Sequence, residues 1–379
     1  MDTNTETGGE SALGTTKRPG PPQLAKPFVS VIVTNYNYAK FIEECLASIL
    51  AQTYTNFECV VVDDRSTDGS PEVIRTYLAT HPEGHRARLH ECTENGGQMA
   101  AFIEGFRLSK GTFVVFVDAD DWLFPSFLEA HVAAHLNAAR PAGISCSDSV
   151  LIDAEGGQLT GTDQIFARLA PGERLAPPLA TRVHPIAATP EEAGGHALLY
   201  VAPNDNPGGP WIWTTTSAIM FRRGILETIL SDRVRDIRIC ADYYLLRFAH
   251  LIGGTLLFRR PLGAYRLHGN NNYAATGIVG TGTSRGRPEH AATLAMIRAR
   301  TLEEVAGRYD IFAATIGAPQ AKRLLANLTS VATFWKAVRA LTRPRRSSRW
   351  RDLPSFLVLF AISQARWLAA RMRMRFWFA

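Results

Sequence analysis

Three carboxylates follow one of the most apolar short segments of the chain. Residues 113–117, which read FVVFV, lead directly into Asp118, Asp120 and Asp121. A short apolar run bounded by turn signals is typical of a buried strand in a parallel sheet, and such strands present functional groups at their carboxyl ends. Crowded carboxylates raise one another's pKa, so a divalent cation with oxygen ligands would neutralise them. The alternative is a solvated acidic turn that caps the next helix.

A second pair of acids ends another predicted strand. Residues 57–62, FECVVV, are followed by Asp63 and Asp64. Short β-branched runs alternate here with segments of helical periodicity, which predicts a doubly wound, mostly parallel α/β sheet flanked by helices. Because the carboxyl ends of parallel strands lie at one edge of a sheet, both acid groups are expected to share one site. No G-x-G-x-x-G follows the first strand, residues 28–34, which disfavours a dinucleotide cofactor.

The elements that must position these acids are predicted from the spacing of apolar residues. Strands are expected at 28–34, 57–62, 87–92, 113–117 and 143–152, and helices at 41–52, 71–78, 95–108 and after Pro125. Residues 153–209 are rich in Pro, Gly and Ala with little periodicity, which indicates a functional loop or a partly ordered insertion. Beyond them the pattern predicts a strand within 211–221, a helix at 242–251, a short strand at 255–258 and two helices over 291–341.

Composition and charge limit the possible classes of protein. The 379 residues suffice for one large domain with additions or for two domains. Five scattered cysteines without a C-x-x-C pair favour reduced thiols over a zinc site or a disulfide framework. The net charge of +6 is local, because residues 343–379 contain nine arginines and a single acid. The charge therefore does not indicate that the main domain binds nucleic acid. Residues 1–27 are polar and lack an apolar core, so we expect a disordered leader.

Six segments in a fixed order carry a family resemblance. They are VSVIVTNYNYAKFIEECLASILAQTY, VVVDDRSTDGS, ENGGQ, FVDADDW, CADYYLLRFA and YRLHGNN. Together, over residues 28–272, they resemble the family 2 glycosyltransferases of the GT-A fold. The resemblance implies a Rossmann-like GT-A domain at 28–275, with 153–209 as a variable or acceptor region and a helical C-terminal extension at 290–379. It also implies inverting transfer of a sugar from a nucleotide diphosphate donor, assisted by Mg²⁺ or Mn²⁺.

The resemblance assigns five residues to the donor. Thr34 and Asp64 look like contacts to the nucleotide base, and Tyr36 and Asp63 stand beside them. Asp118 is similar to the first acid of the family's D-x-D motif, which lies near the ribose. An alternative for Asp64 is that its side chain caps a turn.

Four further residues are assigned to the metal and to catalysis by the same resemblance. Asp120 corresponds to the metal-binding acid of the D-x-D motif, and the adjacent Asp121 would share that task. His268 resembles a residue that closes over the diphosphate or the metal; an ordinary loop histidine is the alternative. Asp242 stands where the family places its catalytic base, although a helix cap would also explain it. A positioned carboxylate that takes the acceptor's proton contributes about 10²–10⁴-fold to such a reaction.

The chain also departs from the family pattern. Many relatives carry an acid before the base and Arg-Asn after the N-x-G segment, whereas this chain has Ala241 and Phe102-Ile103 there. The first difference weakens the assignment of the base, and the second removes a polar contact from the donor pocket. Trp211 and Trp213 would suit stacking on an acceptor sugar or packing in the core.

The C-terminal segment predicts contact with a membrane surface. Residues 353–362 are apolar, but Gln364 and Arg366 interrupt them before the roughly 20 residues that a span requires. Aromatic side chains mixed with arginines are typical of a helix that lies in the interface of an anionic leaflet. Packing on the catalytic domain and an oligomer contact are the alternatives. The expected location is cytoplasmic, peripheral at the inner face of the cell membrane.

The sequence thus leads us to expect a metal-dependent, hexosyltransferase-type enzyme that acts on a saccharide or lipid-linked acceptor in the assembly of surface polysaccharide. A non-catalytic sugar-nucleotide-binding module recruited to the membrane is the alternative. A sugar-1-phosphate nucleotidyltransferase is disfavoured, because the first strand lacks a Gly-rich, basic phosphate loop. No nucleic-acid partner is expected.

Overall fold

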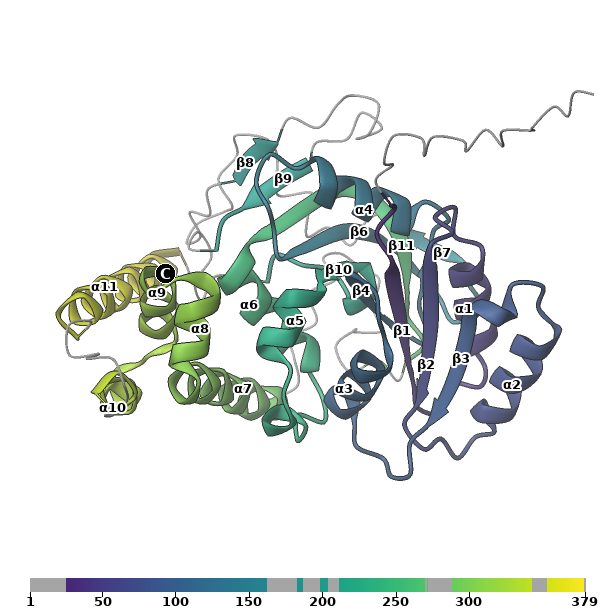
Figure 1. Cartoon of the computed structure of the whole chain (residues 1–379), viewed down its shortest axis with the longest axis horizontal. Coiled ribbons are helices and arrows are strands. Elements are labelled where there is room, and N and C mark those ends of the chain that lie inside the picture. The colour runs from purple at the N-terminus through teal and green to yellow at the C-terminus, as the bar shows by residue number, and fades with distance from the viewer. Residues whose placement is uncertain are drawn as a thin grey trace, which may run out of the picture.

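One eleven-stranded sheet with helices on both faces organises the molecule (Figure 1). The structure is a computed structural model, and it describes residues 25–161, 183–186, 198–203, 211–269, 271, 288–342 and 353–377. The predicted leader and most of the predicted 153–209 insertion lie outside these residues.

The strands in chain order are β1 Val29–Asn35, β2 Phe57–Asp63, β3 Ala87–Glu91, β4 Phe113–Asp118, β5 Trp122–Leu123, β6 Ile144–Ile152, β7 Gln158–Thr160, β8 Val183–Ile186, β9 Leu198–Val201, β10 Ile219–Arg222 and β11 Thr255–Arg266. The helices are α1 Ile42–Leu50, α2 Ser70–Thr80, α3 Gln98–Leu108, α4 Phe127–Asn137, α5 Arg223–Ile229, α6 Ala241–Gly253, α7 Pro288–Gly307, α8 Tyr309–Ile316, α9 Ala318–Leu328, α10 Phe334–Thr342 and α11 Leu353–Trp377. The sheet has the order β3-β2-β1-β4-β10-β6-β11-β9-β8, with β5 paired to β11 and β7 to β6.

The first four strands of this order are parallel, as the sequence predicts. β1 lies between β2 and β4, and all three consist mainly of buried apolar residues. The register pairs Thr34 with Asp118 on one side of β1 and Asn35 with Asp63 on the other. The acidic ends of β2 and β4 therefore flank the end of β1.

The second half of the sheet is mixed. β10 runs antiparallel to both β4 and β6, while β11 is parallel to β6 and antiparallel to β9. The predicted short strand at 255–258 continues to Arg266, because β11 passes through register shifts around Pro261 and Gly263 without ending there. These two residues are turn signals in a sequence, but irregularities of this kind also accommodate them within a strand.

The predicted strand within 211–221 is formed only by β10. The residues before β10 do not continue the strand, because their side-chain hydroxyl groups form hydrogen bonds with distant residues, and such bonds compete with the regular backbone pairing of a strand. Thr214 Oγ1 donates to the Ser147 carbonyl at 2.8 Å, and Thr215 and Ser217 donate to Asp121.

Helices cover both faces of the sheet. One face of the sheet is covered by α1, α2 and α4, and the other face by α3, α5 and α6. The helices α8 to α11 lie to the left of α6 in Figure 1. The region predicted as two helices over 291–341 forms α7 to α10, because Arg308, at φ −118°, Gly317, at φ +83°, and the turn at Ser330 interrupt it. Among the described residues, no helix is both long enough and apolar enough to cross a membrane.

Candidate active site

The carboxyl ends of β1 and β4 bring Thr34 and Asp118 together. Thr34 Oγ1 donates a hydrogen bond of 3.4 Å to Asp118 Oδ1, and Asp118 N donates to Ser217 Oγ at 3.0 Å. Burial, followed by the nearby negative charges of Asp120 and Asp242, raises the pKa of Asp118 to about 7. Asp118 is therefore a carboxylate that a bound cation would help to ionise.

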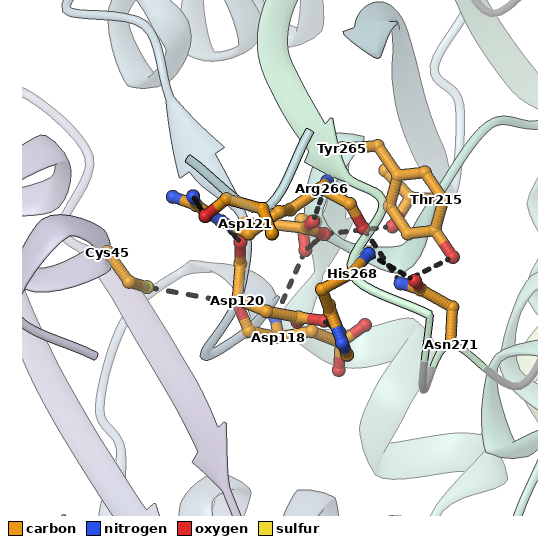
Figure 2. A network of polar contacts seen from close by, with 11 residues as sticks. Cys45, Asp118, Asp120, Asp121, Thr215, Tyr265, Arg266, His268 and Asn271 are labelled. Atoms are coloured by element: carbon orange, nitrogen blue, oxygen red, sulfur yellow. Dashed lines mark hydrogen bonds and ion pairs between the residues drawn. The ribbon is translucent and has the colours of Figure 1, made fainter. Parts of the chain in front are cut away.

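Asp120 faces a histidine from the far end of the domain. His268 Nε2 lies 2.8 Å from Asp120 Oδ2, and both side chains are almost fully buried (Figure 2). The imidazole packs against Tyr38 and Phe41, with ring centroids 5.6 and 5.2 Å away. Asn271 Oδ1 accepts a hydrogen bond from His268 N at 2.9 Å, which holds the loop that carries the histidine.

Asp121 points away from this pair and into the protein. Its Oδ1 accepts the backbone N–H of Arg266 at 3.1 Å, and its Oδ2 accepts the hydroxyls of Ser217 at 2.6 Å and Thr215 at 3.2 Å (Figure 2). The residue is 0% exposed, and burial, followed by the charges of Asp120 and Asp118, raises its pKa well above the ordinary value. Both oxygens of Asp121 therefore accept hydrogen bonds from protein groups.

Arg266 is a residue of the site that our sequence reasoning did not assign. Its buried guanidinium lies between the rings of Phe41 and Trp122, each 4.8 Å from it. Arg266 Nε donates to the Asp120 carbonyl at 2.9 Å, and Nη2 forms an ion pair with Glu44. This arginine fixes the backbone of the acidic loop. The available signal was its place in the YRLHGNN segment, next to Tyr265 and close to His268.

Asp242 approaches the acids from α6. It is the second residue of that helix, and Cys240, at φ +60°, occupies the capping position. Burial raises the pKa of Asp242 to about 6. Gln98, the first residue of α3, joins the two sides of the site: its Oε1 accepts the N–H of Ala241 at 3.0 Å, and its side chain also hydrogen-bonds Asp118.

Two of the acids predicted for the donor are bound within the protein. Asp63, which is 1% exposed, accepts Asn35 Nδ2 at 2.6 Å and the N–H of Ser66 at 2.8 Å. Asp64 accepts the N–H groups of Gly96 and Gly97 at 2.8 and 2.7 Å, and burial raises its pKa. Asp64 thereby fixes the loop that leads into Gln98 and the rest of the site.

The structure thus brings five of the predicted site residues into one cluster and places the other four around it. Thr34, Asp118, Asp120, His268 and Asp242 form one cluster of contacts and neighbouring charges. Asp63, Asp64 and Asp121 bond mainly to protein groups around it, and Tyr36 is 46% exposed. Within the described part of the chain, no three His, Cys, Asp or Glu side chains are already arranged as a metal site.

An α/β fold with a cluster of acids at the strand ends is typical of enzymes that bind ligands at that edge of the sheet. Residues 30–184 match the family model described as Glycosyl transferase family 2. An uncharacterized glycosyltransferase of Nostoc sp. is 29% identical over 246 residues, which are 65% of this chain and 66% of that relative. The chain spans smaller shares of other relatives, such as 14% of Glycosyltransferase GlyA of Streptococcus pneumoniae.

Solved structures show only a distant likeness. TarS of S. aureus (residues 1–349, in complex with UDP) is 16% identical with a TM-score of 0.48, covering 83% of this chain and 79% of that one. The mannosyltransferase of Pyrobaculum calidifontis, in complex with GDP-Man and Mn²⁺, is 21% identical with a TM-score of 0.42, covering 94% and 90%.

Residues 30–184 carry a family 2 glycosyltransferase domain, and this match confirms the resemblance read from the sequence. The predicted α/β sheet flanked by helices is confirmed, and glycosyltransferase is confirmed as the class of this domain.

Proposed function

We propose that the chain transfers a sugar from a nucleotide diphosphate donor to a hydroxyl group of a saccharide or lipid-linked acceptor, with inversion at the anomeric carbon. The observation that carries the proposal is the convergence of Asp118 and Asp120, at the end of β4, with Asp242 of α6, because the charges of Asp120 and Asp242 both raise the pKa of Asp118. The donor lies at the end of β1, with its base near Thr34, Tyr36 and the loop held by Asp64.

The acidic cluster fits a divalent cation. Asp120 and His268 offer an oxygen and a nitrogen ligand 2.8 Å apart. Burial and the charges of Asp120 and Asp242 raise the pKa of Asp118, so a cation bound nearby would stabilise its ionised form. We assign Asp120 and His268 to Mg²⁺ or Mn²⁺, with the remaining positions left for donor phosphates. Bound there, the ion would stabilise negative charge on the leaving diphosphate. The contacts of Asp121 support a positioning role for it instead of the direct ligation expected from the sequence.

Asp242 is assigned as the general base. A carboxylate with a pKa of about 6 is mostly ionised at neutral pH and still basic enough to accept the proton of a hydroxyl in the transition state. Its place on α6, on a different element from Asp120, suits attack from the face opposite the leaving group. Gln98 hydrogen-bonds both the start of α6 and Asp118, and so sets the distance between the base Asp242 and the acids that follow β4.

The acceptor is assigned to the region around Trp211. The half-buried Trp211 ring stacks on Tyr243, the residue after Asp242, with centroids 5.9 Å apart and planes 9° apart. An aromatic ring that packs on the residue next to the base suits stacking against a sugar face. Trp213 is excluded from this role because it is 0% exposed and donates to Thr255 Oγ1 at 3.2 Å.

The alternative is a module that binds the sugar nucleotide without catalysis. Hydrolysis of nucleotide sugars by the full chain with Mn²⁺, compared between wild type and Asp242→Asn, separates the two functions. We expect the variant to lose turnover while donor affinity, measured by thermal shift, is retained. Asp232→Asn is the matched control, because that exposed carboxylate forms an ion pair with a surface arginine, Arg107. Equal rates for wild type and Asp242→Asn would exclude Asp242 as the base.

We also propose that the C-terminal region contacts the inner face of the cell membrane peripherally, which would bring the enzyme to a lipid-linked acceptor in surface polysaccharide assembly. The arginine content of that region supports this proposal.

A further inference from the structure

Helix α11 carries apolar side chains on two opposite faces. On one face Phe356 and Phe360 pack against Phe334 of α10, with ring centroids 6.3 and 5.0 Å from it. On the other face Val358 is 60% exposed and Ile362 is 45% exposed. A surface helix of a globular protein normally turns charged or polar side chains to the solvent, so this second face requires a partner.

The exposed face is a continuous stripe. Its members are uncharged, exposed and spaced at i, i+3, i+4, i+7, i+8 and i+11 along the helix: Pro354, Leu357, Val358, Ala361, Ile362 and Ala365. The helix is held in place along both edges of the stripe, because Gln364 Nε2 donates to the Thr329 carbonyl at 2.9 Å and Lys322 Nζ to Ser355 Oγ at 3.0 Å. The stripe is therefore fixed outward by tertiary contacts.

The neighbouring segment adds two large apolar side chains. Trp335 of α10 is 69% exposed, and Val331, in the short helix before it, is 76% exposed. Trp335 follows Phe334, the residue that packs on α11, with the two rings 5.4 Å apart. Tryptophan is enriched where one end of a side chain is in an apolar medium and the other in water.

Charge indicates which partner fits this surface. After residue 310 the chain has thirteen Lys and Arg and a single acid, Asp352. A cationic segment around an apolar stripe is complementary to an anionic lipid surface. No described helix can span a bilayer, so the complementary arrangement is a helix lying along it. Figure 1 shows α11 at the end of the molecule opposite β2 and β3.

We propose that the exposed face of α11, together with Trp335, is the surface that inserts into the headgroup region of an anionic bilayer. The proposal rests on the peripheral membrane contact proposed above and identifies the residues that make it. Leu357, Val358 and Ile362 enter the apolar boundary, and the arginines of the C-terminal segment bind anionic headgroups.

Flotation of the full chain with vesicles tests this surface. The vesicles are phosphatidylcholine alone or phosphatidylcholine with phosphatidylserine. The test variant is Val358→Asp with Ile362→Asp. The control is Leu136→Asp on α4, because Leu136 is equally apolar and 57% exposed but lies on another element. Circular dichroism and nucleotide-sugar hydrolysis in solution establish that each variant is folded and that its active site is intact.

We expect wild type and Leu136→Asp to float only with phosphatidylserine vesicles, and the double variant to lose at least about tenfold in partitioning, because charges on this face oppose burial in the interface. If wild type does not float, the peripheral membrane contact itself is wrong, whatever the hydrolysis assay shows. If the double variant floats like wild type, the contact exists but lies elsewhere. If wild type is a dimer that the double variant converts to monomer without any lipid effect, a second copy covers the face and the proposal is wrong.

Discussion

Asp120 and Asp121 are neighbours in the sequence, but their carboxylates have different partners, so substitutions should separate their roles. Asp120 meets His268 in the candidate metal site, whereas Asp121 is fully buried and accepts the Arg266 N–H and the hydroxyls of Thr215 and Ser217. We expect substitution of Asp120 to change activity and substitution of Asp121 to change stability.

The magnitudes follow from these contacts. Asp121→Ala removes three hydrogen bonds and strands the buried Arg266 N–H, which costs about 1–3 kcal/mol for the stranded donor and about 2–5 kcal/mol in total. Asp121→Asn keeps an acceptor for that N–H and relieves repulsion with Asp118 and Asp120, so its effect should stay within about 1 kcal/mol. Asp120→Asn should leave stability nearly unchanged but lower Mn²⁺-dependent hydrolysis about a hundredfold or more.

Urea unfolding measures the stability of each variant, and donor hydrolysis titrated with Mn²⁺ measures metal use. The decisive variant is Asp121→Asn. If it folds with wild-type stability but loses Mn²⁺-dependent turnover as Asp120→Asn does, then Asp121 is a metal ligand and the positioning role is refuted. If Asp121→Ala is as stable as wild type, the three hydrogen bonds do not have the value assigned to them.

Three other outcomes are expected. Turnover per bound donor should fall as pH drops through about 6, the pKa of Asp242, and a pH–rate profile without this limb would contradict its role as base. Burial raises the pKa of Asp242 above its value in the unfolded chain, so its ionisation destabilises the folded state as the pH rises through about 6. In urea unfolding, Asp242→Asn should therefore be more stable than wild type by about 1–3 kcal/mol at pH 8. Near pH 4 the two proteins should be equally stable. Gln98→Leu should reduce kcat about 10- to 100-fold with little change in donor KM, because Ala241 and Asp118 lose their common hydrogen-bond partner. Gln98→Glu keeps the acceptor for the Ala241 N–H and should retain more of the wild-type kcat. A change confined to KM would instead assign Gln98 to donor binding.

The first half of the sheet is predictable from the sequence because its signals are local. β-branched runs, helical spacing and turn residues lie within a few positions of each other, and they place β1, β2 and β4 correctly. The second half is less predictable. Pro261 and Gly263 read as a turn, but the pairing of β11 with β6 carries the strand past them.

The helical extension shows the same limit. Spacing alone predicts two helices where α7 to α10 are found, because apolar residues recur smoothly across Gly317 and Ser330. In the structure the direction of the chain changes at these points, since each helix must turn its apolar side toward α6 or α11.

The sequence by itself determined that acids stand at the ends of two parallel strands, because the position and burial of such strands follow from short-range apolar patterns. Only the tertiary structure decided which acid does what. Asp120 and Asp121 are adjacent in the sequence, but their hydrogen-bond partners lie far along the chain. His268 bonds Asp120, whereas the Arg266 backbone and Ser217 bond Asp121. The roles of adjacent carboxylates depend on partners that only folding brings within hydrogen-bonding distance, and local sequence carries little information about those partners.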